Sequence, residues 1–457
     1  MIEDKRQRFK QWLASGEARL LPLTLPQREL WENSPVAVAD AANHICGFIE
    51  IKGTITYEQC REALDRVVAR HEALRTTFLP GKERPLQMVR ISGTGNLLFR
   101  DLSGTEATAA KLEEVMQETF LAPLELMQGP LHLVEMIRLS GQHHLLAFSI
   151  HHAIADGWSL GVFVQDLCTA WLLSLRGRPS SPHGGMPAVP QTYAEWGAAD
   201  RAFWQVADLT VRVAFWKAHL AGSCPVLGPS DDDVPPASGP LDRCIFAIPP
   251  QLTQQVRRFS KSTGTTLFSS LLSLFQFTLS RWRGSPDILT GSPVANRHRE
   301  NCWQTMGYFA GVVPIRSVVH PDHTFSARAR SVHATAIDCF ANAMPFAELA
   351  AAVGPVPPGH RHTIFDVRFA LQNHPVPDVN LPGISTQLRM RSTGTARFDL
   401  GCEITEEGAG LEVVWLYRPC VLNSKGPSEL HTLFIDVLSY ACRCPDSPCS
   451  SFTPTAA

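Results

Sequence analysis

Two adjacent histidines, His151 and His152, are the residues of this sequence best suited to acid–base chemistry. They stand in the segment FSIHHAIADGWSLGV, where an apolar run typical of a strand leads into a turn that closes at Asp156 and Gly157. Histidine exchanges a proton near neutral pH, so one of the two can act as a general base toward a nucleophile. Because side chains alternate along a strand, only one imidazole can face a given cavity.

The residues after the histidines suggest the rest of a site. Asp156 lies past the turn, where its carboxylate is better placed to hold the loop through a charged partner than to act as a second base. Gly157 permits close approach of the backbone to a ligand, and a helix that begins near Trp158 can favour negative charge that develops at its N-terminus. The earlier pair, His143 and His144, begins the strand without an Asp-Gly partner, and we interpret it as non-catalytic.

One helix with a clear start signal precedes this site. Thr56 followed by Gln59 forms a capping box, and apolar residues then recur at helical spacing into the segment RHEALRTTF. The pattern places Arg70, His71 and Arg75 on this helix. We expect these three to make structural ion pairs rather than to contact substrate.

The other predicted elements alternate between strands and helices. Strand-like runs cover 86–91, 97–100, 131–137, 145–150 and 287–291, and helical patterns cover 159–175, 251–262 and 267–282. A cluster of prolines and glycines separates the two halves of the chain. The sequence therefore predicts an α/β (α+β) fold with a first lobe at 1–178, a linker at 179–192, a second lobe at 193–450 and a loose tail at 451–457.

Composition excludes several classes of function. The chain has 457 residues, 44% of them hydrophobic and 18% charged, with a formal net charge of -2, so no global field attracts nucleic acid or anionic membranes. No signal peptide is visible, and polar residues interrupt the most apolar helix, so we expect a cytoplasmic protein without a membrane span. The 12 cysteines are dispersed, and the group Cys442, Cys444 and Cys449 lacks zinc-knuckle spacing, which predicts reduced thiols and no metal.

At this point the motifs identify a family. The string HHAIADGWS resembles the HHxxxDG core of the condensation domains of nonribosomal peptide synthetases, and further segments resemble the other motifs of that family in family order. These are LPLTLPQRELW at 21–31, RHEALRTTF at 70–78, QTYAEW at 191–196, FWKAHLAG at 215–222, ILTGSPVANR at 288–297, MGYFAGVVPIR at 306–316, MPFAELA at 344–350 and FALQNHP at 369–375.

The resemblance implies a fold and roles for the central motif. It implies two chloramphenicol-acetyltransferase-like lobes in a V shape, with the active site in a tunnel between them. His152 would face the tunnel as the catalytic histidine, and His151 would help to hold the loop. Asp156 would pair with Arg297 and so tie the two lobes across the site, while the acyl thioester would pass at Gly157.

The same resemblance suggests residues along the substrate tunnel. Ser159 would add a hydrogen bond near the thioester arm. Tyr308, Gln372 and Asn373 could line the tunnel or could equally belong to the core and the edge of a sheet. The family often has asparagine where this chain has Gly311, and this departure puts the acceptor pocket in doubt but not the chemistry.

The implied function is acyl transfer without a bound cofactor. A donor acyl or aminoacyl group, carried as a phosphopantetheine thioester on a carrier protein, would pass to an acceptor amine, or to a hydroxyl in an ester-forming variant. An acyl-CoA-dependent acyltransferase of the same fold and a non-catalytic module that docks carrier proteins are the alternatives. The chain is either a freestanding condensation enzyme or a segment of a larger synthetase, and its start at Met1 favours the former.

Overall fold

The structure, a computed structural model, divides into two compact units. It describes residues 2–33, 41–80, 84–104, 109–175, 186–227, 242–298, 300–354, 364–372, 380–381, 383–391, 398–419, 421–422 and 426–454. Unit 1 comprises Met1–Ala207, Ala295–Ala310 and His374–Thr393, and unit 2 comprises Asp208–Val294, Gly311–Asn373 and Gly394–Ala457. Each unit therefore draws on three stretches of chain, whereas the sequence predicts one continuous stretch for each lobe.

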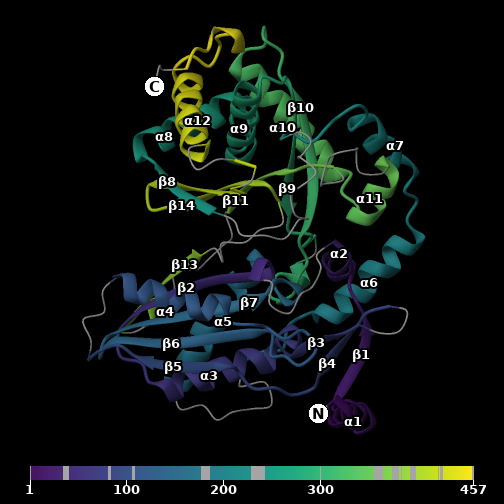
Figure 1. Ribbon diagram of the computed structural model, residues 1–457, viewed down its shortest axis with the longest axis vertical. Coiled ribbons are helices and arrows are strands. Elements are labelled where there is room, and N and C mark those ends of the chain that lie inside the picture. The colour runs from purple at the N-terminus through teal and green to yellow at the C-terminus, as the bar shows by residue number, and fades with distance from the viewer. Residues whose placement is uncertain are drawn as a thin grey trace. The chain divides into compact units, whose positions relative to one another are not determined.

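Unit 1 is built around a six-stranded mixed sheet (Figure 1). Its order is β12 (Asn380–Leu381), β13 (Ile384–Arg391), β2 (His44–Lys52), β7 (His143–His151), β6 (His132–Ser140) and β5 (Leu97–Asp101). The central strand β7 is buried almost from end to end, because helices cover both faces of the sheet. Helix α4 (Ala109–Leu121) packs on one face, and α3 (Tyr57–Arg70) and α5 (Gly157–Leu175) pack on the other.

Helix α3 begins as the sequence predicts but ends earlier. The Thr56 side chain accepts from the backbone N–H of Gln59, and the Gln59 side chain accepts from that of Thr56, which confirms the predicted capping box. The helix ends at Arg70 and the chain continues as a short 3₁₀ turn, η2 (Glu72–Arg75). The placement of His71 and Arg75 on the helix was therefore wrong: His71 has an extended backbone at the C-cap, and its buried ring bonds to Asp166.

Unit 1 contains further elements beside this sheet. A separate three-stranded sheet has the order β1 (Ala18–Pro22), β4 (Leu86–Arg90) and β3 (Thr76–Leu79). The remaining elements are α1 (Ile2–Ala14), α2 (Leu25–Asn33), η1 (Ala41–Asn43), η3 (His152–Ile154), α6 (Tyr193–Val206) and η4 (Glu300–Cys302).

Unit 2 has its own six-stranded sheet. The strand order is β10 (Gly311–Val318), β9 (Asp287–Val294), β11 (Val367–Gln372), β14 (Leu400–Glu407), β15 (Gly410–Tyr417) and β8 (Asp242–Ile248). Its helices are α7 (Thr210–His219), α8 (Pro250–Thr263), α9 (Leu267–Arg283), α10 (Phe325–Ala341), α11 (Phe346–Val353) and α12 (Gly426–Arg443), with η5 at Cys449–Ser451. The mixed α/β composition of both units agrees with the predicted fold class.

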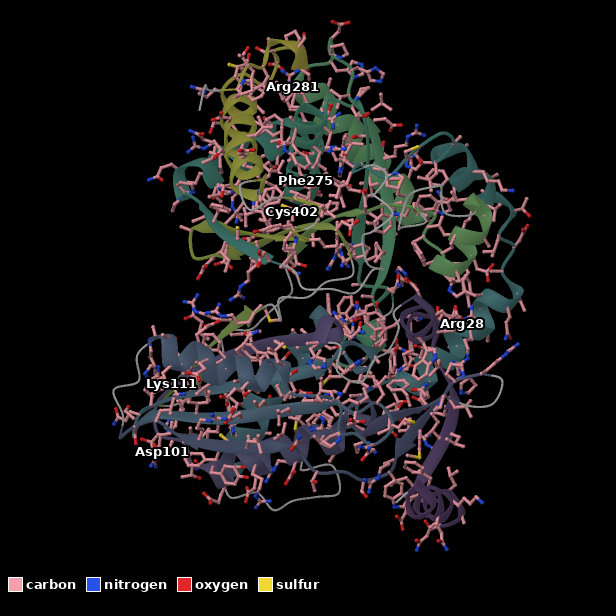
Figure 2. The ribbon with its side chains drawn as sticks, viewed as in Figure 1. Arg28, Asp101, Lys111, Phe275, Arg281 and Cys402 are labelled. Atoms are coloured by element: carbon pink, nitrogen blue, oxygen red, sulfur yellow. The ribbon has the colours of Figure 1, made fainter. Side chains whose placement is uncertain are left out.

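The core of unit 2 forms around α9. Residues 269–280 of this helix are all buried, including its serines and Gln276, which donates to the Ile315 carbonyl at 2.9 Å. Figure 2 labels Phe275 of α9 and Cys402 of β14, which belong to this core. Phe452 is also buried there, although the sequence predicts a loose tail at this position, because its ring packs on Phe277.

Disulfides, metal sites and membrane-spanning helices, none of which the sequence predicts, can be checked in the described residues. None of the described cysteines forms a disulfide, and no group of three or more His, Cys, Asp or Glu side chains in the described part of the chain could hold a metal ion. No single described helix is long and apolar enough to cross a bilayer, and only α10 and α11, which meet at a bend of 110°, satisfy length and composition as a pair. Half of the predicted linker, residues 179–185, lies outside the described residues.

Candidate active site

The adjacent histidines His151 and His152 have different surroundings at the end of β7. His151 is the last residue of the strand and is buried, and its Nδ1 accepts a hydrogen bond from the backbone N–H of Ala153 at 3.0 Å. This bond caps the 3₁₀ turn η3. His152 is the first residue of that turn and is partly exposed. The side chain of His151 thus holds the turn, while that of His152 retains contact with solvent.

The orientation of His152 follows from one hydrogen bond. Its Nδ1 lies 3.2 Å from the carbonyl oxygen of Ala155, and a carbonyl can only accept, so Nδ1 carries the proton. In the neutral imidazole Nε2 then holds the lone pair and is the basic nitrogen. The Tyr308 ring lies edge-on to the imidazole, with a centroid separation of 5.5 Å.

Asp156 is a buried structural carboxylate that caps α5. Its Oδ1 accepts from the backbone N–H of Ser159 at 2.9 Å, as an N-cap residue does, and its Oδ2 accepts from the backbone N–H of Phe309 at 3.0 Å. The third helical N–H of α5 is thereby occupied. This arrangement fits the interpretation of Asp156 as a residue that holds the loop, not as a second base.

Arg297 is the charged partner of Asp156. Its Nη2 lies 3.1 Å from Asp156 Oδ1, and both side chains are at least 97% buried. Nη1 donates to the carbonyls of Cys302 and Thr305, each at 2.7 Å, and the guanidinium stacks over the Phe309 ring at 3.8 Å. Both charged residues belong to unit 1, so the pair lies within one unit and does not join the two as expected.

Ser159 connects α5 to the segment that contains Tyr308. Its Oγ lies 2.8 Å from both Asp156 Oδ1 and the carbonyl of Gly307, and it accepts from the Gly307 N–H at 3.1 Å. Ser159 is fully buried, so its hydroxyl serves this connection and is not exposed to a ligand. Its expected hydrogen bond to a thioester arm therefore has no support here.

Tyr193 holds the other side of this segment, a role that the sequence did not indicate. Its hydroxyl donates to the Tyr308 carbonyl at 2.5 Å and lies 2.8 Å from Thr24 Oγ1. Burial raises the pKa of this phenol well above its ordinary value, which keeps the hydroxyl protonated as a donor. A Cβ at Gly307 would lie only 2.2 Å from the Tyr193 ring, so this close approach requires glycine. The position of Tyr308 beside His152 thus depends on Tyr193.

Two further side chains hold the turn after β7 and the segment that contains Tyr308. Gln27 of α2 is buried, and its Nε2 donates to the carbonyl of Ala153 at 2.9 Å. His71 Nδ1 accepts from the N–H of Met306 at 3.4 Å, so its Nε2 carries the proton and donates to Asp166 Oδ2 at 2.6 Å. Burial lowers the pKa of His71, which favours this neutral form. The motifs LPLTLPQRELW and RHEALRTTF were the only signals in the sequence for these supports.

The predicted tunnel residues are distributed over both units. Gly157 begins α5 in unit 1 and is partly exposed. Gly311 is the first residue of β10 and pairs with Val294, and Gln372 is the last residue of β11 and pairs with Thr405, both in unit 2. Asn373 lies outside the described residues. The structure thus brings together the histidines, Asp156, Gly157, Ser159, Arg297 and Tyr308 in unit 1.

The structure also supports the non-catalytic interpretation of the earlier histidine pair. His143 and His144 are the first two residues of β7, as predicted. His143 Nε2 lies 2.9 Å from Glu50 Oε1, and His144 is buried. Neither is near the turn at the other end of the strand.

Comparison with known proteins places the chain in a family. The profile of the condensation domain family matches residues 17–456. One subunit of the linear gramicidin synthase of Brevibacillus parabrevis is 31% identical over 415 residues, which cover 87% of this chain and 8% of that protein. Another subunit of the same synthase is 28% identical over 414 residues, with 88% and 8% covered. The chain therefore spans less than a tenth of the length of these relatives.

Solved structures share the fold at lower identity. The first condensation domain of the calcium-dependent antibiotic synthetase, in complex with a substrate analogue, has a TM-score of 0.82 and 20% identity, and the match covers 96% of this chain and 99% of that one. The starter condensation domain of rhizomide synthetase, in complex with C8-CoA, has a TM-score of 0.83 and 19% identity, with 95% and 98% covered. The complex of the X-domain and OxyB from teicoplanin biosynthesis has a TM-score of 0.79 and 20% identity, with 96% of each chain covered.

These matches confirm the resemblance and the fold that the motifs predict. The family profile spans nearly the whole chain, and every motif of the series lies inside it. In the two gramicidin synthase subunits, the matching segment is a small part of a much longer protein. The chain belongs to the condensation domain family.

Proposed function

We propose that this chain catalyses condensation, the transfer of an acyl or aminoacyl group from a carrier-protein thioester to an acceptor amine. The observation that carries the proposal is the state of His152: its Nδ1–H is held by the Ala155 carbonyl, which makes Nε2 the basic nitrogen of a partly exposed ring. The surrounding ionic groups, Asp156 and Arg297, are buried and bond to each other and to backbone groups. His152 is therefore the group of this cluster best suited to proton transfer.

The reaction needs one proton carrier and no resident cofactor. The amine nitrogen attacks the thioester carbonyl carbon, and His152 Nε2 accepts the proton that the nitrogen loses as the C–N bond forms. The C–S bond then breaks, and the imidazolium returns the proton to the departing thiolate, so an amide and a free phosphopantetheine thiol result. General-base assistance of this kind contributes about 10²–10⁴-fold to the rate.

Carrier proteins are the proposed partners. The relatives that match this chain are named as peptide synthases, of which the matching segment is a small part. The donor would be presented on the phosphopantetheine of a carrier protein, and the acceptor would be an amine on a second carrier or in solution. A hydroxyl acceptor would use the same base and would give an ester.

The test follows the acyl group by intact-protein mass spectrometry. A donor-loaded carrier protein is incubated with the enzyme and a panel of amines and alcohols, beside His152→Ala and the matched control His143→Ala. We expect acyl loss from the carrier with a matching product, reduced about 10²–10⁴-fold in His152→Ala and unchanged in His143→Ala, whose ring pairs with Glu50. Full turnover by His152→Ala would refute the role of His152.

Two alternatives have an observation in their favour. The related starter domain of rhizomide synthetase is solved with C8-CoA, so acyl-CoA is included as a second donor. Transfer from acyl-CoA without any carrier would assign the chain to the acyl-CoA-dependent acyltransferases. The X-domain of teicoplanin biosynthesis is solved in complex with OxyB, so the same fold also serves in docking. Tight binding of a loaded carrier, with equal product rates for the wild type and His152→Ala, would favour a docking module.

A further inference from the structure

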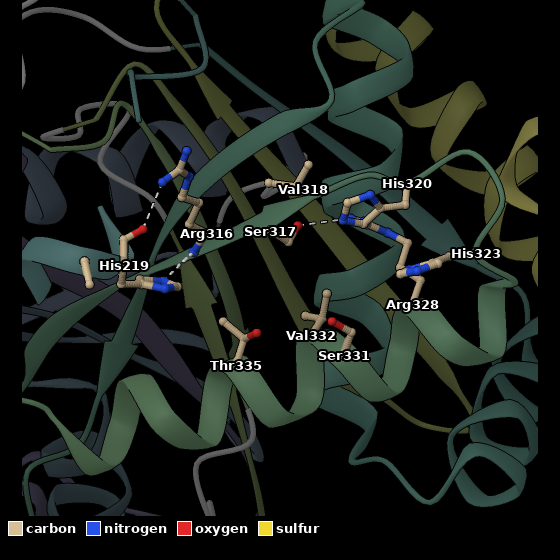
Figure 3. Close-up of a pocket in the computed structure, with 11 residues that line it drawn as sticks. His219, Arg316, Ser317, Val318, His320, His323, Arg328, Ser331, Val332 and Thr335 are labelled. Carbon is tan, nitrogen blue, oxygen red and sulfur yellow. Dashed lines mark hydrogen bonds between the residues drawn. The ribbon is translucent and has the colours of Figure 1, made fainter. Parts of the chain in front are cut away.

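Unit 2 contains a pocket that the proposed condensation reaction does not use. Its volume is about 430 Å³, and it is lined by the end of α7, by β10 with the loop that follows, and by α10 (Figure 3). No lining residue carries a carboxylate. The nitrogen-bearing side chains around it are His219, Arg316, His320, His323 and Arg328.

Arg328 is a buried positive charge without a carboxylate partner among the described residues. It is 3% exposed, its Nη2 donates to Ser317 Oγ at 3.1 Å, and its Nε donates to the Ser273 carbonyl at 3.3 Å. Burial lowers its pKa to about 10, so the guanidinium is still charged at neutral pH. A desolvated cation without a counter-ion is unfavourable, and a bound anion would relieve this cost.

The other arginine of the pocket is already neutralised. Arg316 holds Asp287 with two hydrogen bonds, from Nε to Oδ1 at 2.8 Å and from Nη2 to Oδ2 at 2.7 Å. Its Nη1 donates to the carbonyls of His219 and Ala221 at 3.0 and 2.8 Å. The guanidinium of Arg316 is therefore held in place, and its charge is compensated by Asp287. The charge of Arg328 has no carboxylate partner among the described residues.

Further hydrogen-bond donors complete the lining on two sides. His320 and His323 lie in the loop between β10 and α10, are both exposed, and have ring centroids 4.7 Å apart. On α10, Ser331 and Thr335 follow Arg328 at intervals of three and four residues, so they share one face of the helix. Figure 3 shows these side chains around the same space. Hydroxyl and imidazole N–H groups can all donate to an acceptor-only ligand.

We propose that this pocket binds a tetrahedral oxyanion, either inorganic phosphate or the phosphate group of a small molecule. Arg328 would act as its counter-ion, and His320 and His323 would donate to it from the outer side. A phosphate oxygen accepts short, charge-assisted hydrogen bonds from guanidinium groups, and several donors can share its oxygens. The local charge is what attracts the anion, since the formal net charge of the whole chain is -2.

The test is calorimetric titration of inorganic phosphate into the full chain at constant ionic strength. The variants are Arg328→Gln and the double variant His320→Gln with His323→Gln, and the matched control is Arg330→Gln on the exposed side of α10. We expect saturable binding of one phosphate, weakened at least about tenfold by Arg328→Gln, weakened by the double variant and unchanged by Arg330→Gln. Glycerol phosphate, sulfate and acetate are titrated in parallel, so that free phosphate, phosphate monoesters and carboxylates are distinguished.

Each contrary result overturns the proposal. No saturable phosphate binding would do so, as would equal weakening by Arg330→Gln, which would indicate general surface charge. Acetate binding as tight as that of phosphate would contradict a site for tetrahedral anions. Thermal melting would show whether Arg328→Gln folds. If it does not, the double histidine variant tests the site instead, because the side chains of His320 and His323 are exposed and their replacement should not disturb the fold. Unchanged affinity in that variant would then refute the site.

Discussion

Asp156 and Arg297 are 141 positions apart in the sequence and form a buried ion pair, with 3.1 Å between Oδ1 and Nη2. Each also binds backbone groups of the segment between residues 302 and 309. The pair therefore fixes both the turn that carries His152 and the chain segment that carries Tyr308.

Breaking this pair should destabilise the protein strongly. Asp156→Asn and Arg297→Met each leave a buried charge without its partner, and we expect each to lower the free energy of unfolding by about 3–5 kcal/mol. The double variant should lose less than the sum of the two, because neither charge then remains. Denaturant unfolding of the four proteins measures this coupling.

The exposed pair Arg257 and Glu406 is the matched control for that cycle. Its side chains are 45% and 43% exposed, so the same double-variant cycle should give at most about 1 kcal/mol of coupling. Equal couplings for the two pairs would contradict the structural role of Asp156 and Arg297.

Gly307→Ala should disrupt the segment beside the active-site turn. The added Cβ would lie 2.2 Å from Cδ2 of the buried Tyr193 ring, which is itself packed against Phe309 and Trp196 and cannot move away freely. Overpacking of this kind costs about 1–3 kcal/mol or more. We expect a lower melting temperature and a loss of acyl transfer.

The comparison for this variant is Gly141→Ala. A Cβ at Gly141 would have no atom within 4 Å, so the substitution should leave both the melting temperature and the turnover close to those of the wild type. A Gly307→Ala variant as stable and active as Gly141→Ala would show that the Tyr193 contact is not required.

Tyr193→Phe should act mainly on catalysis through position. The change keeps the ring but removes the hydrogen bond to the Tyr308 carbonyl, a loss of about 0.5–1.5 kcal/mol. Because the Tyr308 ring contacts His152, kcat should fall more than KM changes. Steady-state kinetics of acyl transfer measures the two constants separately.

Tyr57→Phe provides the matched control, since Tyr57 also donates from its hydroxyl to a carbonyl, that of Leu97 at 3.2 Å. It should lower stability without a change in kcat. If the two variants have the same kinetic constants, the hydroxyl of Tyr193 does not position the site.

Acidification should weaken the fold through His132. Burial lowers the pKa of this imidazole to about 4, and its Nε2 accepts from the N–H of Asn96, so it is neutral when folded. The unfolded chain takes up the proton below about pH 6.5, so stability is complete above that pH and is lost as the pH falls toward 4, by about 1.4 kcal/mol for each unit. Urea unfolding at several pH values should show this slope.

His132→Gln should reduce that slope, whereas Asn96→Ala, which removes only the bond to the His132 carbonyl, should lower stability equally at every pH. An unchanged slope in His132→Gln would mean that the proton uptake occurs elsewhere, for example at His431, whose pKa burial also lowers to about 4.

Local features of the site could be predicted from the sequence. The end of an apolar strand, the turn at Asp156 and the start of α5 depend on residues close together in the chain, as does the capping box of Thr56 and Gln59. Their hydrogen bonds form within a few residues, so the residue types themselves carry the information. The resemblance of the motifs to those of the family also implied the fold and the pairing of Asp156 with Arg297.

Contacts between distant segments required the tertiary structure. Nothing in the spacing of residues indicates that Tyr193 reaches the Tyr308 carbonyl, or that Gln27 reaches that of Ala153. The helix predicted to run past Arg70 ends there, and the ring of the next residue, His71, bonds to Asp166, 95 residues away. The amino-acid sequence alone thus indicated the residue that we propose as the proton carrier and the turn that presents it. Only the folded chain decided which side chains hold that turn in place, because buried polar groups are satisfied by whichever partners packing brings within hydrogen-bond distance.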